Sequence, residues 1–427
     1  MKDAPGTVSL REWEYLGYER FGEEQVRRLE EANVRLGGKV FDFYLHGLRA
    51  RNLVGVVSAG GSSVQILPKT HGRSSDPDSL AYLLALLGYT GDLGLKVGDS
   101  ADLGEHRGSF LEVWISHFAR ELNHLLVRSY RQQYVEVERR SAFVRGKLLT
   151  ERDLDGSSNL YARYPCRYEV FTPDHLLNRT LKFCNKLLMK LSRSPKNRAT
   201  LRENDVLLSD VRDVDVLAGD LRRIHLNRLD REYEQVLSLC RLLLESSTLD
   251  LRSGSITQLS FIFDMNLLFE KFVAEFLERN GPRLSVGGHR VREVEAQKHL
   301  GRLFGEFGMK VDVVVHTSGG TYLLDTKYKS LEGDKNHAGL SQADFYQMYG
   351  YVRSRETLYD GVILLYPGTS FSPVNRDFEN RDGARLFVRT LDVERCHDGR
   401  GNVSEWELIQ ELNQAFEGIK ARERSPA

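Results

Sequence analysis

The sequence predicts a multidomain α+β protein in three parts: a β-rich domain over residues 1–95, a helical domain over residues 96–255 and an α/β domain over residues 256–427. The chain has 427 residues, and 41% of them are apolar. Single cores stop growing near about 250 to 300 residues, so this chain builds more than one. The spacing of apolar residues along the chain also changes, from strand-like to helical and then to a mixture of both. Ser and Gly residues collect at residues 251–260, which indicates a domain boundary there.

The N-terminal part shows the alternation that is typical of strands. Residues 54–57 and 64–67 predict a β-hairpin, and the Gly-rich run at residues 58–63 predicts its turn. The segment Gly60-Gly61-Ser62-Ser63 has the small residues of a phosphate loop. No Gly-Lys-Ser/Thr follows it, however, and strand patterns on both sides favour the turn.

Helical spacing begins near the end of the N-terminal part and continues through the middle part. Apolar residues recur three and four positions apart over residues 79–87, 109–134, 178–191 and 231–244, which predicts four helices. An irregular stretch is expected near residues 155–158. Apolar stripes of this kind are typical of a packed core rather than of a cofactor site, so we expect a helical middle domain.

The C-terminal part mixes both periods. Residues 264–280 predict a long helix with Asp264 as its N-cap and Gly281-Pro282 at its end. A second helix is predicted over residues 341–355. Helices that flank a mixed sheet indicate an α/β domain. The predicted strands cover residues 291–297, 309–316, 321–329, 361–366 and 385–393.

Composition narrows the function classes. Lys+Arg and Asp+Glu both total 60, so the net charge gives no reason to expect a polyanionic partner, and any nucleic-acid surface must be local. The four cysteines lie far apart without a CxxC pair, which argues against a zinc site and a disulfide framework. The polar N-terminus and the lack of a long apolar run predict a soluble, cytoplasmic protein with no membrane contact.

The clearest chemistry lies in two predicted strands around a Ser318-Gly319-Gly320 turn. A turn at Ser318-Gly319 pairs Asp312 with Asp325, whereas a turn at Gly319-Gly320 pairs Asp312 with Lys327. Residues two apart in a strand share a face, and directly opposed Cβ atoms lie about 5 Å apart. Both registers therefore bring Asp312, Asp325 and Lys327 together on one face.

Two carboxylates at this spacing repel each other unless a cation lies between them, and oxygen ligands suit Mg²⁺ or Mn²⁺. Such a metal would activate a water and polarise a phosphodiester, and Lys327 would hold the water and stabilise the developing charge. The alternative is a surface hairpin with a solvated ion pair. Against it, both aspartates lie in strands apolar enough for a sheet centre, where acids are rarely placed without a partner.

Asp312 followed by Asp325-Thr-Lys327 resembles the PD-(D/E)XK nuclease motif, in which both acids are metal ligands. Val311 stands where the motif has Pro, a variation that such nucleases tolerate. The segments Phe263–Val273, Gln347–Tyr351 and Leu365-Tyr-Pro367, in this order, resemble McrC, the nuclease subunit of McrBC methylation-dependent (5-methylcytosine) restriction systems. Upstream segments such as Val144-Arg-Gly-Lys-Leu extend the resemblance over nearly the whole chain. It implies a PD-(D/E)XK endonuclease-like domain with a mixed central sheet, and a Mg²⁺-dependent DNA endonuclease.

The resemblance adds three candidate residues to the site. Glu270 on the first helix is expected to be an additional acid that reaches the metal-bound water; the alternative is a surface Glu paired with Lys271 or Arg279. Gln347 and Tyr351 fit the Gln-x-x-x-Tyr element of RecB-like nucleases, which positions the DNA strand. Both share a helix face with Asp344, and the alternative is an ordinary amphipathic helix.

The chain has no Walker A, no Rossmann fingerprint and no basic run, so we expect that it binds no nucleotide itself and needs a partner to hold DNA. The resemblance to McrC implies an McrB-like AAA+ GTPase hexamer that recognises modified double-stranded DNA. The alternatives are a stand-alone RecB-like repair nuclease and a non-catalytic AAA+ adaptor.

Two further sets of residues were considered. His337 is expected in a loop. The basic residues that could contact the AAA+ GTPase hexamer are Arg49, Arg51, Lys69, Arg145 and Lys147.

Overall fold

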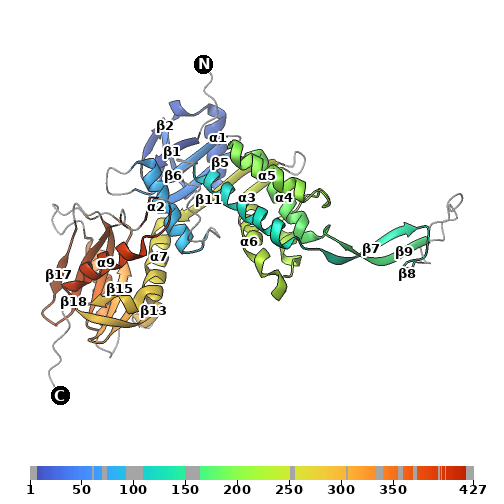
Figure 1. The fold of residues 1–427 in the computed structure, drawn as a ribbon. Coiled ribbons are helices and arrows are strands. Elements are labelled where there is room, and N and C mark those ends of the chain that lie inside the picture. The colour runs from blue at the N-terminus through green and yellow to red at the C-terminus, as the bar shows by residue number, and fades with distance from the viewer. Residues whose placement is uncertain are drawn as a thin grey trace. The chain divides into compact units, whose positions relative to one another are not determined.

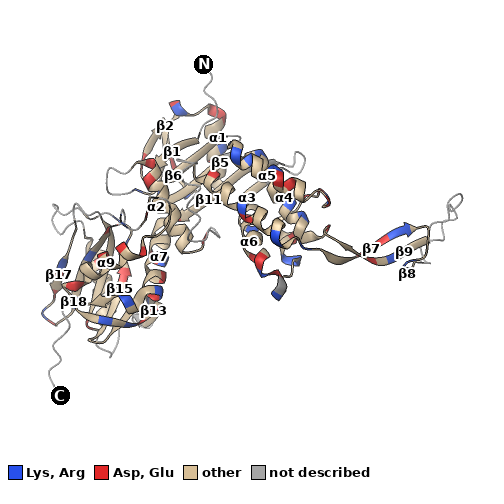
Figure 2. Cartoon of the chain, viewed as in Figure 1, with Lys and Arg blue, Asp and Glu red and all other residues tan. Residues whose placement is uncertain are grey.

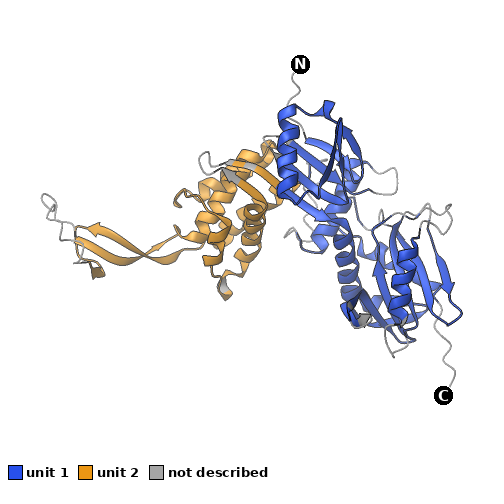
Figure 3. Ribbon diagram, turned by 180° about the vertical axis from the view of Figure 1, so that it is seen from behind, with its two compact units in different colours: residues 1–110, 260–427 blue, residues 111–259 orange. Residues whose placement is uncertain are grey.

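A computed structural model shows a mixed α/β chain with several sheets (Figure 1). The chain divides into two compact units, residues 1–110 with residues 260–427, and residues 111–259 (Figure 3). The finer division into three domains stays a prediction. The structure describes residues 7–59, 62–69, 75–92, 109–149, 164–250, 255–303, 306–329, 331, 340–353, 359–368, 373–392, 395, 397–399 and 401–419.

The N-terminal part of the first unit contains the predicted hairpin. β5 (Leu53–Ala59) and β6 (Ser62–Leu67) are antiparallel with Val57 opposite Val64, while Gly60 and Gly61 of the predicted turn lie outside the described residues. β1 runs parallel to β6, and β11 lies beside β5. The remaining elements are β1 (Thr7–Arg11), β11 (Ser255–Asp264), the small sheet of β2 (Tyr15–Gly17), β3 (Phe41–Tyr44) and β4 (Gly47–Ala50), the helices α1 (Glu23–Arg35) and α2 (Asp76–Tyr89), and the short helix η1 (Tyr18–Arg20).

The second unit keeps three of its predicted helices but is not purely helical. The helix predicted over residues 109–134 ends at Ser129, and β7 (Gln133–Ser141) then pairs with β9 (Tyr164–Thr172) in a ribbon that extends away from the helices (Figure 1). This ribbon was missed because charged residues alternate along it and almost none of its side chains is buried. The irregular stretch at residues 155–158 lies outside the described residues. The other elements are α3 (Phe110–Ser129), β8 (Lys147–Leu148), α4 (Leu176–Leu191), α5 (Pro195–Leu207), η4 (Ala218–Arg223), η5 (Arg228–Asp230), α6 (Arg231–Glu245) and β10 (Ser247–Asp250).

The C-terminal part of the first unit is a mixed seven-stranded sheet in the order β12-β13-β14-β15-β16-β18-β17. The predicted helix over residues 264–280 is confirmed as α7 (Met265–Asn280), and the Asp264 side chain caps it by accepting a hydrogen bond from Asn266 N. The strands β12 and β17 and the helix α9 were not predicted. The elements are η6 (Gly281–Arg283), β12 (Ser285–Val286), β13 (His289–Leu303), β14 (Phe307–Thr317), β15 (Thr321–Thr326), α8 (Gln342–Arg353), β16 (Gly361–Gly368), β17 (Arg376–Glu379), β18 (Arg385–Asp392) and α9 (Glu405–Glu417).

The strands β14 and β15 lie inside this sheet, each with a neighbour on both sides. Their Val314 and Leu323 are fully buried in a core that also takes Met348 and Tyr351 of α8. Burial of such apolar side chains stabilises a sheet by roughly 1.5–3 kcal/mol each. The hairpin that carries the predicted site is therefore rigidly held.

Basic and acidic residues are interspersed over the elements of both units, in line with the zero net charge (Figure 2). Within the described part of the chain, no helix is both long and apolar enough to span a membrane.

We expect Gly55→Ala to unfold at a clearly lower temperature than the wild type. Gly55 has φ +127°, and a Cβ there would meet the carbonyl oxygen of Phe261 in β11 at 1.9 Å. A left-handed backbone at a non-glycine residue alone costs about 1–3 kcal/mol. Gly219→Ala is the control, since a Cβ at Gly219 meets no atom within 4 Å. Equal melting temperatures for both variants by scanning fluorimetry would contradict this packing.

Candidate active site

The hairpin of β14 and β15 has the first of the two predicted registers. Val313 lies opposite Leu324 and His316 opposite Thr321, so one further step places Asp312 opposite Asp325. The turn at Gly319-Gly320, which would pair Asp312 with Lys327, is wrong. Thr317 explains the choice, because its hydroxyl accepts hydrogen bonds from Gly319 N at 3.1 Å and Gly320 N at 3.0 Å and so sets the turn at Ser318-Gly319.

Thr326 fixes Asp312 from the neighbouring strand. The backbone N of Thr326 donates to Asp312 Oδ2 at 2.7 Å, and its hydroxyl donates to the same oxygen at 2.9 Å. Hydrogen bonds to a charged acceptor are short and strong. Asp312 is therefore held in one orientation at the end of the β14–β15 ladder.

Asp325 is the most buried acid of the site, with 2% of its surface exposed. Lys327 Nζ lies 2.6 Å from its Oδ2. Burial, and next the charge of Asp312, raises the pKa of Asp325 to about 7, although the ammonium of Lys327 lowers it. The alternative of a solvated surface ion pair is therefore wrong, because Asp325 is out of contact with bulk water.

Lys327 follows the end of β15, which is three residues shorter than the predicted strand. Its backbone N donates to Leu365 O of β16 at 3.0 Å. The side chain is 27% exposed. Its ammonium group thus stays within reach of solvent while it contacts a buried carboxylate.

Glu270 comes from α7 and joins the two aspartates. Its carboxyl group is close enough to Asp312 for a hydrogen bond, and Gln297 of β13 donates its amide N–H to Glu270 Oε1. Burial first, and then the charge of Asp312, raises the pKa of Glu270. The alternative pairing of Glu270 with Lys271 or Arg279 is not found, since both cations contact Glu275 instead.

A family model described as "McrBC 5-methylcytosine restriction system component" matches residues 48–367, about three quarters of the chain. The chain belongs to this family. No curated protein matches the sequence.

Two solved structures have a fold similar to that of this McrBC-family chain. One is a chain of "Refined half-complex from tetradecameric assembly of Thermococcus gammatolerans McrB AAA+ hexamers with bound McrC". It aligns with a TM-score of 0.73 and 21% identity over 96% of this chain and 99% of that chain. The other is a chain of "Cryo-EM structure of the Thermococcus gammatolerans McrBC complex", with a TM-score of 0.52 and 24% identity over 64% of this chain and 88% of that chain.

The helix α8 brings Tyr351 to the same site. Its hydroxyl donates to Lys310 O on β14 at 2.8 Å and accepts from Gln347 Nε2 at 2.7 Å. Burial, and next the charge of Asp325, raises the pKa of Tyr351 to about 12, so the hydroxyl keeps its proton at neutral pH. Tyr351 is 5% exposed and holds the strand of Asp312, whereas Gln347 remains open to solvent.

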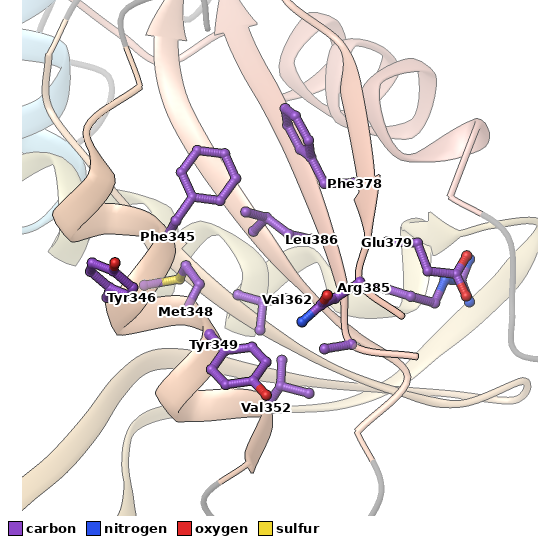
Figure 4. A pocket seen from close by; sticks show the side chains of 12 residues that line it. Phe345, Tyr346, Met348, Tyr349, Val352, Val362, Phe378, Glu379, Arg385 and Leu386 are labelled. Atoms are coloured by element: carbon purple, nitrogen blue, oxygen red, sulfur yellow. The ribbon is translucent and has the colours of Figure 1, made fainter. Parts of the chain in front are cut away.

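Asp344 shares this face of α8, as predicted, but has a structural role. It accepts a hydrogen bond from Ser341 N at 3.2 Å and one from Tyr366 at 3.2 Å, and it pairs with Lys329. These contacts tie α8 to the segment after β15. The neighbouring faces of α8 and of β16 to β18 line an open pocket of about 410 Å³ (Figure 4), which the six predicted site residues do not line.

The sequence did not reveal three of the donors around the site. Thr326 could have been considered, because it stands between Asp325 and Lys327 in the motif. No spacing in the sequence points to Gln297 or Lys329 as donors. Of the histidines, His316 bonds Glu295 at 2.8 Å beside the hairpin turn, and His337 lies outside the described residues.

Asp312 and Asp325 are the pair that could hold a divalent cation. Within the described residues, no three His, Cys, Asp or Glu side chains are arranged as a metal site.

We expect Asp325→Asn to be more stable than the wild type at pH 8 in the presence of EDTA. The raised pKa means that ionisation of Asp325 is less favourable in the folded chain, so its contribution to stability is complete below about pH 4 and is lost as the pH rises to about 7. Each pKa unit corresponds to about 1.4 kcal/mol. Melting temperatures should diverge between pH 5 and pH 8.

Asp174→Asn is the control, for which we expect the opposite change in melting temperature. Hydrogen bonds from Arg179 hold the pKa of Asp174 well below its usual range, so its charge stabilises the fold above that range. Asp174→Asn should therefore melt below the wild type at neutral pH. An Asp325→Asn variant that loses stability as Asp174→Asn does would contradict the assigned electrostatics.

Proposed function

We propose that this chain is the nuclease subunit of an McrBC-type restriction system and cleaves DNA phosphodiester bonds with Mg²⁺ or Mn²⁺ in a PD-(D/E)XK-like domain. One observation carries the proposal: in a chain of the McrBC family, Asp312, Asp325 and Lys327 converge on one face of a central hairpin. Glu270 joins them from α7. The site combines acids that attract a cation with one ammonium group.

The donor set fits a small hard cation. The pKa of Glu270 and that of Asp325 are both raised in part by the charge of Asp312, and a divalent cation would relieve this repulsion. Mg²⁺ is usually held by one or two carboxylates and completes its octahedron with water and phosphate oxygens. Two aspartates are therefore enough. When bound, the ion would supply Lewis-acid activation of the phosphodiester and of a water.

The other residues of the site would position the water and the charge. Lys327 Nζ lies at the solvent side of Asp325, where it can hold the attacking water and oppose the negative charge that develops on phosphorus oxygens. Glu270, beside Asp312, can accept a hydrogen bond from the same water. Gln347 is an exposed residue whose amide nitrogen donates to the Tyr351 hydroxyl, and its second N–H can bind a phosphate oxygen without adding charge.

We further propose that cutting requires an AAA+ GTPase hexamer, because a similar fold occurs in a structure of McrB hexamers with bound McrC and this sequence has no nucleotide-binding motif. The segment that follows β7 and leads into β8 offers a docking surface. Phe143 is 74% exposed and Val144 56% exposed beside Arg145 and Lys147. Exposed aromatic and arginine residues are favoured at interfaces. The alternative contacts, Arg49 and Arg51, are paired with Asp42.

We expect Asp325→Asn and Lys327→Ala to reduce DNA cleavage by the assembled complex at least about 10³-fold, because each removes a group that acts on the reacting phosphate. Stimulation of the partner's GTP hydrolysis should be unchanged. Glu379→Gln, an exposed acid on the edge strand β17, should leave both activities as in the wild type. Cleavage of a methylated plasmid and phosphate release from GTP measure the two activities.

Other results would favour the alternatives. Metal-dependent cleavage without GTP or a partner would indicate a stand-alone RecB-like nuclease. Full cleavage by the complex with Asp325→Asn would indicate a non-catalytic adaptor of the AAA+ ring.

A further inference from the structure

Gln297 has an unusual backbone for its place in the fold. It lies within β13, a 15-residue strand, but has φ +55°. Among the described residues, only Trp13 and Gln297 are non-glycine residues with positive φ. This conformation costs a residue of order 1–3 kcal/mol and persists only where other contacts impose it.

The pairing of the strand does not require this conformation. Ala296 lies opposite Val313 and Lys298 opposite Val311, so the register is the same on both sides and Gln297 faces Asp312. The register shifts of β13 occur elsewhere, between Val291 and Glu293 and between His299 and Gly301. Gln297 is thus not the extra residue of a bulge.

The side chain of Gln297 makes the contact that accounts for its position. Its amide N–H donates to Glu270 Oε1 on α7, and the carboxyl of Glu270 in turn contacts Asp312. Asp312 is held from its other side by Thr326. A line of contacts therefore runs from β13 through α7 to β14 and β15.

We propose that Gln297 is a positioning residue that holds Glu270 against Asp312 in the orientation needed for the divalent cation and the attacking water. The inference rests on the proposed function. An amide suits this role because it donates a directed hydrogen bond without charge, whereas Lys or Arg would cancel the negative charge that attracts the cation. Outer partners of this kind typically change metal affinity or activity by about 10- to 100-fold.

The test is Gln297→Gly in the full chain, with Mn²⁺ as the probe. Glycine adopts positive φ without strain, so the melting temperature should be unchanged or higher. The lost hydrogen bond should weaken Mn²⁺ binding by about tenfold in calorimetry. Gln297→Asn keeps an amide and tolerates the left-handed backbone, but it is one methylene shorter, and it should show the same loss of affinity. Lys298→Ala, the next residue along β13, should bind Mn²⁺ as the wild type does.

Two results would overturn the inference. Wild-type Mn²⁺ affinity in both Gln297→Gly and Gln297→Asn would show that the contact with Glu270 positions nothing. A fall of affinity only in proportion to a fall of melting temperature would show a purely structural role. Failure of the proposed function is distinct, since the wild type would then bind no Mn²⁺ at this site and Asp312→Asn would change nothing.

Discussion

The C-terminal sheet has to accommodate three acidic side chains that are packed together. Glu270, Asp312 and Asp325 come from three different elements, and burial together with mutual repulsion raises the pKa of Glu270 and of Asp325. Such repulsion opposes folding. It is tolerated here because β14 and β15 are anchored by neighbouring strands and by a core of fully buried valine and leucine side chains.

Each of the three acids also has its own donor. Thr326 donates to Asp312, Gln297 donates to Glu270, and Lys327 pairs with Asp325. Two of these donors are neutral, so they orient the carboxylates without removing their charge. The fold thus holds the acids in fixed orientations, which the proposed electrostatic catalysis requires. The stability lost at the site would be the physical basis of the proposed binding of a cation.

The central hairpin was predictable from the sequence because its alternating apolar residues and its Ser-Gly-Gly turn are local signals. The face shared by Asp312, Asp325 and Lys327 followed from the two-residue period of a strand. The register itself did not, since it depends on the hydroxyl of Thr317. The cap at Asp264 was also a local signal and is confirmed.

Long-range features escaped prediction. Gln297 meets Glu270 only because α7 packs on β13, and no spacing in the sequence encodes that contact. The ribbon of β7 and β9 has almost no buried side chains, so hydrophobic periodicity could not reveal it. The hydroxyl of Tyr351 donates to Lys310 O of β14 and accepts from Gln347, and no spacing in the sequence encodes the contact with β14. The DNA-positioning role expected of Gln347 and Tyr351 stays a prediction.

Anomalous scattering from crystals of the full chain grown with Mn²⁺ tests the central claim most directly. We expect one peak within ligand distance of both the Asp312 and the Asp325 carboxylates and close to Lys327, and we expect this peak to disappear in Asp325→Asn. A clear Mn²⁺ peak elsewhere in the chain with none at this hairpin would contradict it.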